Sequence, residues 1–231
     1  MNSMILLQVA DSAANAAQAA QATEESMSFL SLAIKGGWIM IVLAVLSVMA
    51  IYIFIDRYIA IRKASKEQQS FMENIKNFIH NGKVEQALDA CKMNQGPLSR
   101  MIEKGIMRIG RPLNDINAAV ENVGKQEIAK LEKGLPVLAS IAGGAPMLGF
   151  LGTVMGMIKA FYDMAHAGNN IDITLLSNGI YLAMITTVGG LIVGIVAYFA
   201  YNILVSRIDS LVAQLESRTT AFMDILNEPV N

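Results

Sequence analysis

The feature that most constrains the fold is an uncharged segment of 34 residues, from Ile173 to Ser206. As a helix with a rise of about 1.5 Å per residue, this segment would reach roughly 50 Å. The apolar slab of a bilayer is only about 30 Å thick. The segment therefore predicts a membrane helix that extends beyond the lipid.

Two further uncharged segments are long enough to cross a bilayer. They are the 20 residues from Gly36 to Ile55 and the 25 residues from Gly134 to Ile158. Charged residues make up 16% of the chain, against about 25% in an ordinary soluble domain. We therefore predict an integral membrane protein, with three transmembrane helices in the lipid membrane.

The basic residues are distributed unevenly around these spans. The loop between the first two spans is basic next to the membrane, whereas the opposite side offers only Lys35 and Lys159. Positive residues favour the cytoplasmic side, so we expect a cytoplasmic loop, a cytoplasmic C-terminus and an N-terminus outside. The basic residues beside the first two spans are Arg57, Arg62, Lys63, Lys66, Lys125, Lys130 and Lys133.

No strand pattern competes with the helical periodicity, so the predicted fold class is all-α. Three transmembrane helices carry long cytoplasmic extensions, which form a helical bundle. The predicted segments are a periplasmic N-terminal segment (1–35), a first transmembrane helix (36–55), a cytoplasmic helical domain (56–133), a second transmembrane helix (134–158), a periplasmic loop (159–172), a third transmembrane helix (173–206) and a cytoplasmic C-terminal helix (207–231).

Glycine and proline divide the cytoplasmic domain into shorter helices. We expect the first span to continue as an amphipathic helix to His80-Asn81-Gly82, where glycine supplies a C-cap. Helices then follow over Val84 to Met93, Leu98 to Ile109 and Asn114 to Gly134. The N-terminal segment lacks a signal-peptide pattern and permits a surface helix or disorder.

Several function classes are disfavoured. The only cysteine, Cys91, cannot form an intramolecular disulfide or a soft-metal cluster, so we expect no metal and no cofactor. A net charge of -1 argues against a nucleic-acid partner. No P-loop and no nucleophile-base arrangement is evident, so we predict that the chain is not an enzyme.

Small residues line one side of the second and third spans at helical spacing, which favours close helix packing in lipid. We assign packing roles to Gly149, Gly152, Gly156, Ala183, Gly190 and Gly194. Thr153 and Thr187 lie within these stripes, and Thr186 adjoins Thr187. A hydroxyl pair on two facing helices could hold water or an acidic side chain of a partner in an apolar lumen, so these three threonines are the candidate pore-lining residues.

These residues resemble the MotA/TolQ/ExbB family of proton-channel proteins of bacterial inner membranes. The matching runs are APMLGFLGTVMG from Ala145 to Gly156 and GIYLAMITTVGGL from Gly179 to Leu191. Three spans, an outside N-terminus and a large first cytoplasmic loop extend the likeness to nearly the whole chain. The ExbB branch is more similar than the flagellar stator branch, which would have four spans.

The resemblance implies a pentamer whose second and third helices line a central pore. The pore would enclose the single-span helices of a small ExbD-like or TolR-like partner, whose aspartate accepts the protons. Proton flow would drive a TonB-like protein that reaches the outer membrane. Thr153 and Thr187 would then face the partner's carboxylate.

One position departs from the family pattern. Many members carry a glutamate where this chain has Leu182, and no residue from Ile173 to Ser206 carries an ionisable carboxylate, amine or imidazole. Either the partner's aspartate and ordered water suffice for proton transfer, or this member does not conduct protons. The hydroxyl pair favours the first alternative.

Three functional hypotheses stay open. The leading one is an ExbB-like motor subunit that uses the proton gradient to energise TonB-dependent outer-membrane transport. A TolQ-like subunit for envelope integrity is its nearest relative. The rival from another class is a non-conducting membrane scaffold, which should be indifferent to a protonophore.

Overall fold

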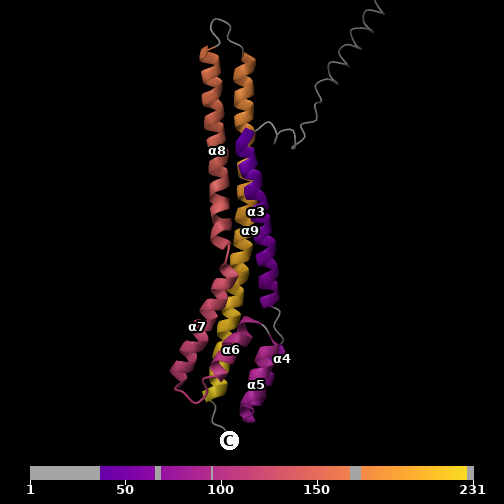
Figure 1. Cartoon of the computed structure of the whole chain (residues 1–231), viewed down its shortest axis with the longest axis vertical. Helices are drawn as coiled ribbons and strands as arrows, with labels where there is room; N and C mark the ends of the chain where they lie inside the picture. Colours follow the sequence, from indigo (N-terminus) through magenta and orange to yellow (C-terminus); the bar gives the residue numbers. More distant parts are fainter. Residues whose placement is uncertain (1–36, 66–68, 95, 167–172, 228–231) are drawn as a thin grey trace, which may run out of the picture. The chain divides into compact units, whose positions relative to one another are not determined.

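The structure, a computed structural model, describes residues 37–65, 69–94, 96–166 and 173–227. Every regular element in these ranges is an α-helix (Figure 1), which confirms the all-α prediction. The predicted N-terminal segment, 1–35, lies outside the described residues. In chain order the helices are α3 (Gly37–Ala64), α4 (Gln69–His80), α5 (Val84–Met93), α6 (Pro97–Ile106), α7 (Leu113–Glu132), α8 (Leu135–His166) and α9 (Ile173–Asn227).

Three stretches of helix are long and apolar enough to cross a membrane. They lie in α3, in the stretch from Leu113 to His166 that contains α8, and in α9. Many of their large apolar side chains, such as Ile41, Tyr52 and Phe150, are exposed in the single chain. Exposed apolar surface of this extent fits lipid or other membrane helices rather than water, and it confirms the prediction of a multi-pass membrane protein with three spans.

Two of these helices extend beyond the uncharged segments that predicted them. α8 runs for 32 residues to His166, so residues 159–166, which we assigned to the loop, are helical. No glycine or proline occurs between Lys159 and His166 to end the helix earlier. α9 continues for 55 residues to Asn227, so the C-terminal segment prolongs the third span as expected.

The first span does not continue to His80 as one helix. α3 ends at Ala64, Ser65 lies in a turn, and α4 begins at Gln69. The described residues at this end of α3, Arg62 to Ser65, include no large apolar side chain, so nothing there prolongs the apolar face of the span. In a water-exposed segment, burial of an apolar face supplies most of the stability of a helix.

The end of α4 agrees with the predicted glycine C-cap. Gly82 has φ +68°, a left-handed conformation that glycine adopts without a steric penalty. The amide of Lys83 donates to Phe78 O at 2.8 Å, and that of Gly82 donates to Ile79 O at 3.0 Å. These two bonds form a Schellman motif, which satisfies the last carbonyl groups of α4.

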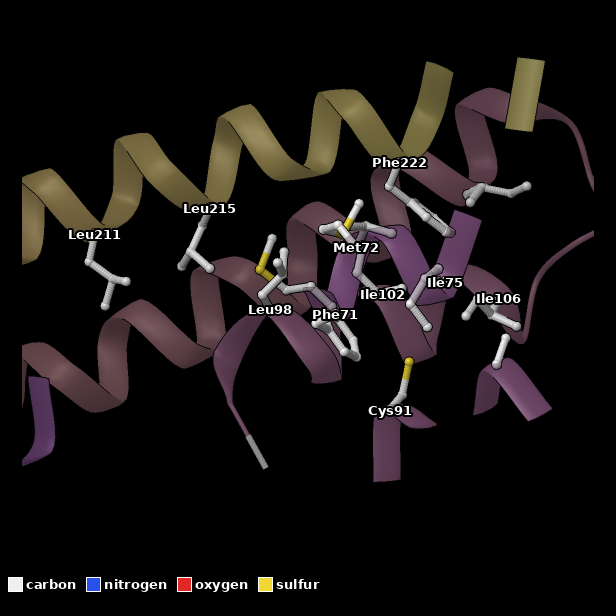
Figure 2. Close-up of a cluster of buried hydrophobic side chains, with 14 residues drawn as sticks. Phe71, Met72, Ile75, Cys91, Leu98, Ile102, Ile106, Leu211, Leu215 and Phe222 are labelled. Carbon is white, nitrogen blue, oxygen red and sulfur yellow. The ribbon is translucent and has the colours of Figure 1, made fainter. Parts of the chain in front are cut away.

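The helices between the first and second spans share a hydrophobic core with the C-terminal part of α9. Figure 2 shows Leu211, Leu215 and Phe222 projecting from α9 toward side chains of the shorter helices. Ile75 of α4, Ile102 of α6 and Phe222 are completely buried. Burying a side chain of this size contributes about 1.5–3 kcal/mol, so the core explains why the predicted bundle forms. Its other labelled members in Figure 2 are Phe71, Met72, Cys91, Leu98 and Ile106.

The chain divides into two compact units. One comprises Met1–Val42 and Leu148–Gly189, and the other comprises Leu43–Met147 and Gly190–Asn231. The predicted threonines and the run from Gly149 to Gly156 all belong to the first unit. The bundle, Pro146 and Gly194 belong to the second unit.

Candidate functional site

Small residues bring α8 and α9 together within the first unit. A side-chain carbon added at Gly156 would lie 2.9 Å from Ala183 Cβ, and one added at Gly152 would overlap Thr186. On α9, Gly179 faces Ala160 in the same way. Glycine and alanine at these positions therefore permit the close backbone approach that is typical of helices in lipid.

This close approach joins the two predicted pore-lining hydroxyls. The Oγ1 atoms of Thr153 on α8 and Thr187 on α9 lie 2.5 Å apart, and either can be the donor. Each is also 3.2 Å from the carbonyl oxygen of Gly149. Both threonines are half-buried, so the pair is both held by the protein and partly accessible.

The number of hydroxyl protons in this pair determines whether it can donate or accept hydrogen bonds toward a ligand. Each hydroxyl has one proton to donate and two lone pairs to accept with. If one proton goes to Gly149 O and the other joins the two hydroxyls, both protons are used and lone pairs are left over. In this arrangement Thr153 and Thr187 act toward a third group as hydrogen-bond acceptors, which suits water or a protonated carboxyl.

Thr186 occupies a different position from the one we expected. Its side chain is buried, with an exposed fraction of 4%. Its hydroxyl donates to Ala183 O at 2.7 Å, and it also lies 3.4 Å from Gly149 O. Adjacent residues of a helix point about 100° apart, so Thr186 packs between the helices while Thr187 meets Thr153. The pore-lining role of Thr186 stays a prediction, and in the single chain its hydroxyl lies between the helices.

The remaining small residues of the candidate site lie as follows. Gly149 is buried, and its carbonyl oxygen accepts from the threonines. In the second unit Gly190 is buried, and a carbon added at Gly194 would lie 2.5 Å from Pro146 Cγ. Leu182, where many family members carry glutamate, is half-buried.

The chemistry available around the hydroxyl pair is limited. No group of three metal-ligating side chains occurs in the part of the chain that the structure describes. The pair can position a water molecule or an acid by hydrogen bonding, but threonine hydroxyls without a neighbouring base are poor nucleophiles. The arrangement fits a conduction path better than an active site.

The sequence interpretation missed one polar cluster, which lies in the bundle of the second unit. Glu127 on α7 is buried, with Arg100 Nη1 at 2.5 Å and Lys130 Nζ at 2.6 Å. Its position could have been noticed, because Glu127 continues the helical spacing of the buried residues Ile116 and Val120. A carboxylate in a core-facing position requires charged partners.

The fold and the packed hydroxyl site define an α-helical membrane protein with three spans. More particularly, the chain belongs to the MotA/TolQ/ExbB proton channel family, whose model matches residues 93–217. The matched residues include α8, the whole hydroxyl site and most of α9. Because the members of this family are proton channels, membership confirms the prediction that the chain is not an enzyme.

Individual relatives come from two branches of the family. The chain is 28% identical over 183 residues to an ExbB homolog of Methanothermobacter thermautotrophicus, covering 79% of this chain and 64% of that protein. It is 26% identical over 204 residues to the Tol-Pal system protein TolQ of Pseudomonas aeruginosa, covering 84% and 88%. It is 38% identical over 104 residues to the biopolymer transport protein ExbB of Aquifex aeolicus, covering 43% and 68%.

The coverage of these relatives is uneven. The chain spans slightly less than two thirds of the Methanothermobacter protein, at 64%. Both ExbB and TolQ proteins match, so the comparisons establish the family and not the branch.

Proposed function

We propose that the chain is an ExbB-like subunit of an inner-membrane motor that uses the proton gradient to energise TonB-dependent outer-membrane transport. Membership of a proton channel family supports a conducting role. The observation that carries the proposal is the contact between Thr153 and Thr187, at 2.5 Å, beside the Gly149 carbonyl. It provides hydrogen-bond acceptors within an otherwise apolar pair of helices.

In the proposed mechanism, the titrating carboxyl comes from a partner. The uncharged segments of the second and third spans contain no acidic, basic or imidazole side chain, whereas proton relays normally depend on an ionisable group within the membrane. An ExbD-like single-span protein would bring its carboxyl to the hydroxyl pair. Thr153 and Thr187 would accept the hydrogen bond of the protonated acid and release it when the acid ionises.

The proposed assembly is a homo-pentamer that encloses this partner and acts on a TonB-like protein. Its support is family membership, together with the exposed apolar faces of the spans, such as Met147, Phe150 and Met184. Native mass spectrometry of the complex purified with its partner would count the subunits on both sides. A complex that contains this chain alone would contradict the partner assignment.

The functional test replaces both hydroxyls with methyl groups of similar size. Thr153→Val together with Thr187→Val should abolish gradient-dependent uptake in cells that lack the native protein, while the oligomer stays intact. The matched control is Thr219→Val together with Thr220→Val, two threonines of α9 that lie outside the hydroxyl pair. Thr220 donates within its own helix, and the buried Thr219 hydroxyl has no hydrogen-bond partner in the part of the chain that the structure describes, so neither change should affect uptake.

The outcomes separate the conducting role from the scaffold. If uptake survives the double change at Thr153 and Thr187 and resists a protonophore, the helices only pack and the scaffold hypothesis holds. If uptake is lost in both double variants, the loss is not specific to the hydroxyl pair. Loss only in the first variant, with unchanged oligomer mass, supports conduction through this site.

A TolQ-like role in envelope integrity is the second candidate. It is favoured by the length of the TolQ alignment, which covers 84% of this chain and 88% of that relative. Deletion of the gene in its native host distinguishes the branches. Loss of energised uptake with an intact envelope supports the ExbB-like role, whereas detergent sensitivity with normal uptake supports the TolQ-like role.

We also propose that residues 56–133 and the C-terminus are cytoplasmic and that the N-terminus is periplasmic in a bacterial inner membrane. The support is the basic residues that follow the first span. In a chain with Cys91→Ser, a cysteine at the exposed Met93 should resist an impermeant maleimide in intact cells. A cysteine at the exposed His166 should be labelled, and the reverse pattern would invert the topology.

A further inference from the structure

A cavity in the second unit lies where the extension of the first span meets the bundle. Its volume is about 480 Å³, which falls within the range of small-ligand sites, about 300–1,000 Å³. The wall contains Ala60 and Lys63 of α3, Gly96 at the start of α6, Arg100 of α6, and Glu127 and Lys130 of α7. None of these residues takes part in the proposed proton path.

The charges around this cavity favour an anion. Lys63, Arg100 and Lys130 are cationic, and Glu127 is the only acidic residue among the described residues of the lining, so these four side chains carry a net charge of +2. Arg100 and Lys130 both contact Glu127, which offsets its repulsion of an incoming anion. The side chains of Arg100 and Lys130 are 48% and 64% exposed, so their remaining N–H groups can reach a ligand.

The N-terminus of α6 adds backbone donors to the same wall. Its N-cap residue, Gly96, makes no side-chain capping bond, and the first turn contains no acidic residue. Unpaired N–H groups and the helix dipole favour an anion at such an end. Close behind Gly96, the hydroxyl of Ser99 is fully buried and has no hydrogen-bond partner among the described residues.

The position of the cavity along α3 indicates the source of the anion. Ala60 follows Ile55, the last uncharged residue of the first span, by five residues, or about 8 Å of helix. The head-group layer extends about 5–8 Å beyond the apolar slab. Lys63 lies less than one turn further, and a lysine side chain can reach back toward the interface.

We propose that this cavity binds a phosphate ester, namely the head group of an anionic glycerophospholipid from the adjacent leaflet. Lys63, Arg100 and Lys130 pair with the phosphate, and the acyl chains extend along the exposed apolar surface of α3. Basic pockets beside transmembrane helices have the chemistry that recognises such head groups. The ligand would tie the membrane span to the bundle.

The test measures lipid bound to the purified full-length protein by native mass spectrometry. Delipidated protein is titrated with phosphatidylglycerol or with phosphatidylcholine of the same acyl chains, and a parallel sample receives inorganic phosphate while its thermal unfolding midpoint is followed. The test variant combines Lys63→Gln with Lys130→Gln, which leaves Glu127 paired with Arg100. The control combines Lys83→Gln with Lys104→Gln, two exposed lysines outside the cavity.

Preferential binding of phosphatidylglycerol, weakened about 25-fold in the test variant and unchanged in the control, supports the lipid site. This corresponds to about fivefold for each lysine removed. Stabilisation by inorganic phosphate that depends on Lys63 and Lys130, without preference for phosphatidylglycerol, supports the phosphate site and assigns it to a soluble ligand. No preference between lipids and no phosphate effect, or equal losses in both variants, overturns the proposal.

Discussion

At the residue scale, Gly152 controls how closely α8 and α9 approach, because Thr186 occupies the space that a side chain would need. Gly152→Ala should destabilise the protein by about 1–3 kcal/mol, the usual cost of forcing extra volume into a packed site. The thermal unfolding midpoint of the purified full chain in detergent measures the effect.

Gly143→Ala on the same helix is the matched control for this change. Nothing lies within 4 Å of a side-chain carbon added at Gly143, and alanine favours helix over glycine by about 1 kcal/mol. The control should therefore unfold at the same temperature as the unchanged protein, or slightly higher. Equal midpoints for the two variants would show that the contact at Thr186 does not constrain the helices.

Cys91 gives a second prediction at this scale, from its titration. Burial raises the pKa of the Cys91 thiol from its ordinary value of 9.0 to about 12, with a smaller contribution from the negative charge of Glu103. A raised pKa stabilises the fold fully below pH 9, and this stabilisation is lost between about pH 9 and 12, because the unfolded thiol ionises first. The unfolding midpoint should therefore fall more steeply above pH 9 than that of Cys91→Ala, and parallel slopes would contradict the assignment.

At the element scale, α7 contains two glutamate–lysine pairs that differ in burial. Glu127 is buried beside Arg100 and Lys130, whereas Glu121 is exposed beside Lys125. A hydrogen bond from Lys125 lowers the pKa of Glu121, but solvent screens exposed pairs, so they contribute little to stability. Glu127 pairs with Arg100 of α6, while the ion pair of Glu121 lies within its own helix.

Glu127→Gln should therefore destabilise the bundle by about 2 kcal/mol, because the buried carboxylate that Arg100 and Lys130 contact loses its charge, and Glu121→Gln should leave stability unchanged. Hydrogen exchange of the α6 and α7 amides in the full-length protein measures the difference locally. Faster exchange in both helices is expected only for Glu127→Gln. Similar protection in both variants would mean that Glu127 does not hold the two helices together.

The success of sequence prediction for each element depended on its end signals. α5 occupies the predicted range, Val84 to Met93, because Gly82 precedes it and Gly96-Pro97 follows it. The end of α3 at Ala64 was missed because no glycine or proline marks it, and only the lack of large apolar residues from Arg62 to Ser65 indicates it. α8 exceeded its prediction because charged residues were taken as its end, although Lys159 is compatible with a helix at the membrane edge.

The candidate site could be predicted only in part, for a related reason. Helical periodicity placed Thr153 and Thr187 within two stripes, and the structure brings them to 2.5 Å. Periodicity does not specify how far one helix slides along another, so the role of Gly149 O and the burial of Thr186 against Gly152 were not foreseen. Glu127 was missed because only its helical spacing from Ile116 and Val120 indicates that it lies on the buried face of α7.

At the scale of the whole molecule, the part of α9 that lies in the second unit carries one buried stripe from its membrane segment into the bundle. Successive members are three, four or seven residues apart, so they stay on one side of the helix. Because α9 is an unbroken helix of 55 residues, the rotational position of its membrane segment about the helix axis (its helical phase) fixes which side chains of its bundle segment face the core. The buried members of the stripe in this unit are Gly190, Gly194, Ala197, Leu204, Ile208, Leu211, Leu215 and Phe222.

This continuity predicts that packing of the bundle depends more on the helical phase of α9 than on its composition. One alanine inserted between Ser206 and Arg207 would turn Leu211, Leu215 and Phe222 by about 100° away from the core. The variant should still insert into the membrane, but its bundle amides should lose hydrogen-exchange protection and energised uptake should fail.

Deleting the exposed Asp209 from the inserted chain restores the spacing from Ser210 onward. This combined variant should recover both bundle protection and uptake, because Leu211, Leu215 and Phe222 return to the buried side. Deletion of Asp209 alone should fail as the insertion does, since it turns the same residues by about 100° in the opposite sense. If the insertion alone retains protection and uptake, the two segments of α9 are not mechanically continuous, and the bundle does not need the phase of the third span.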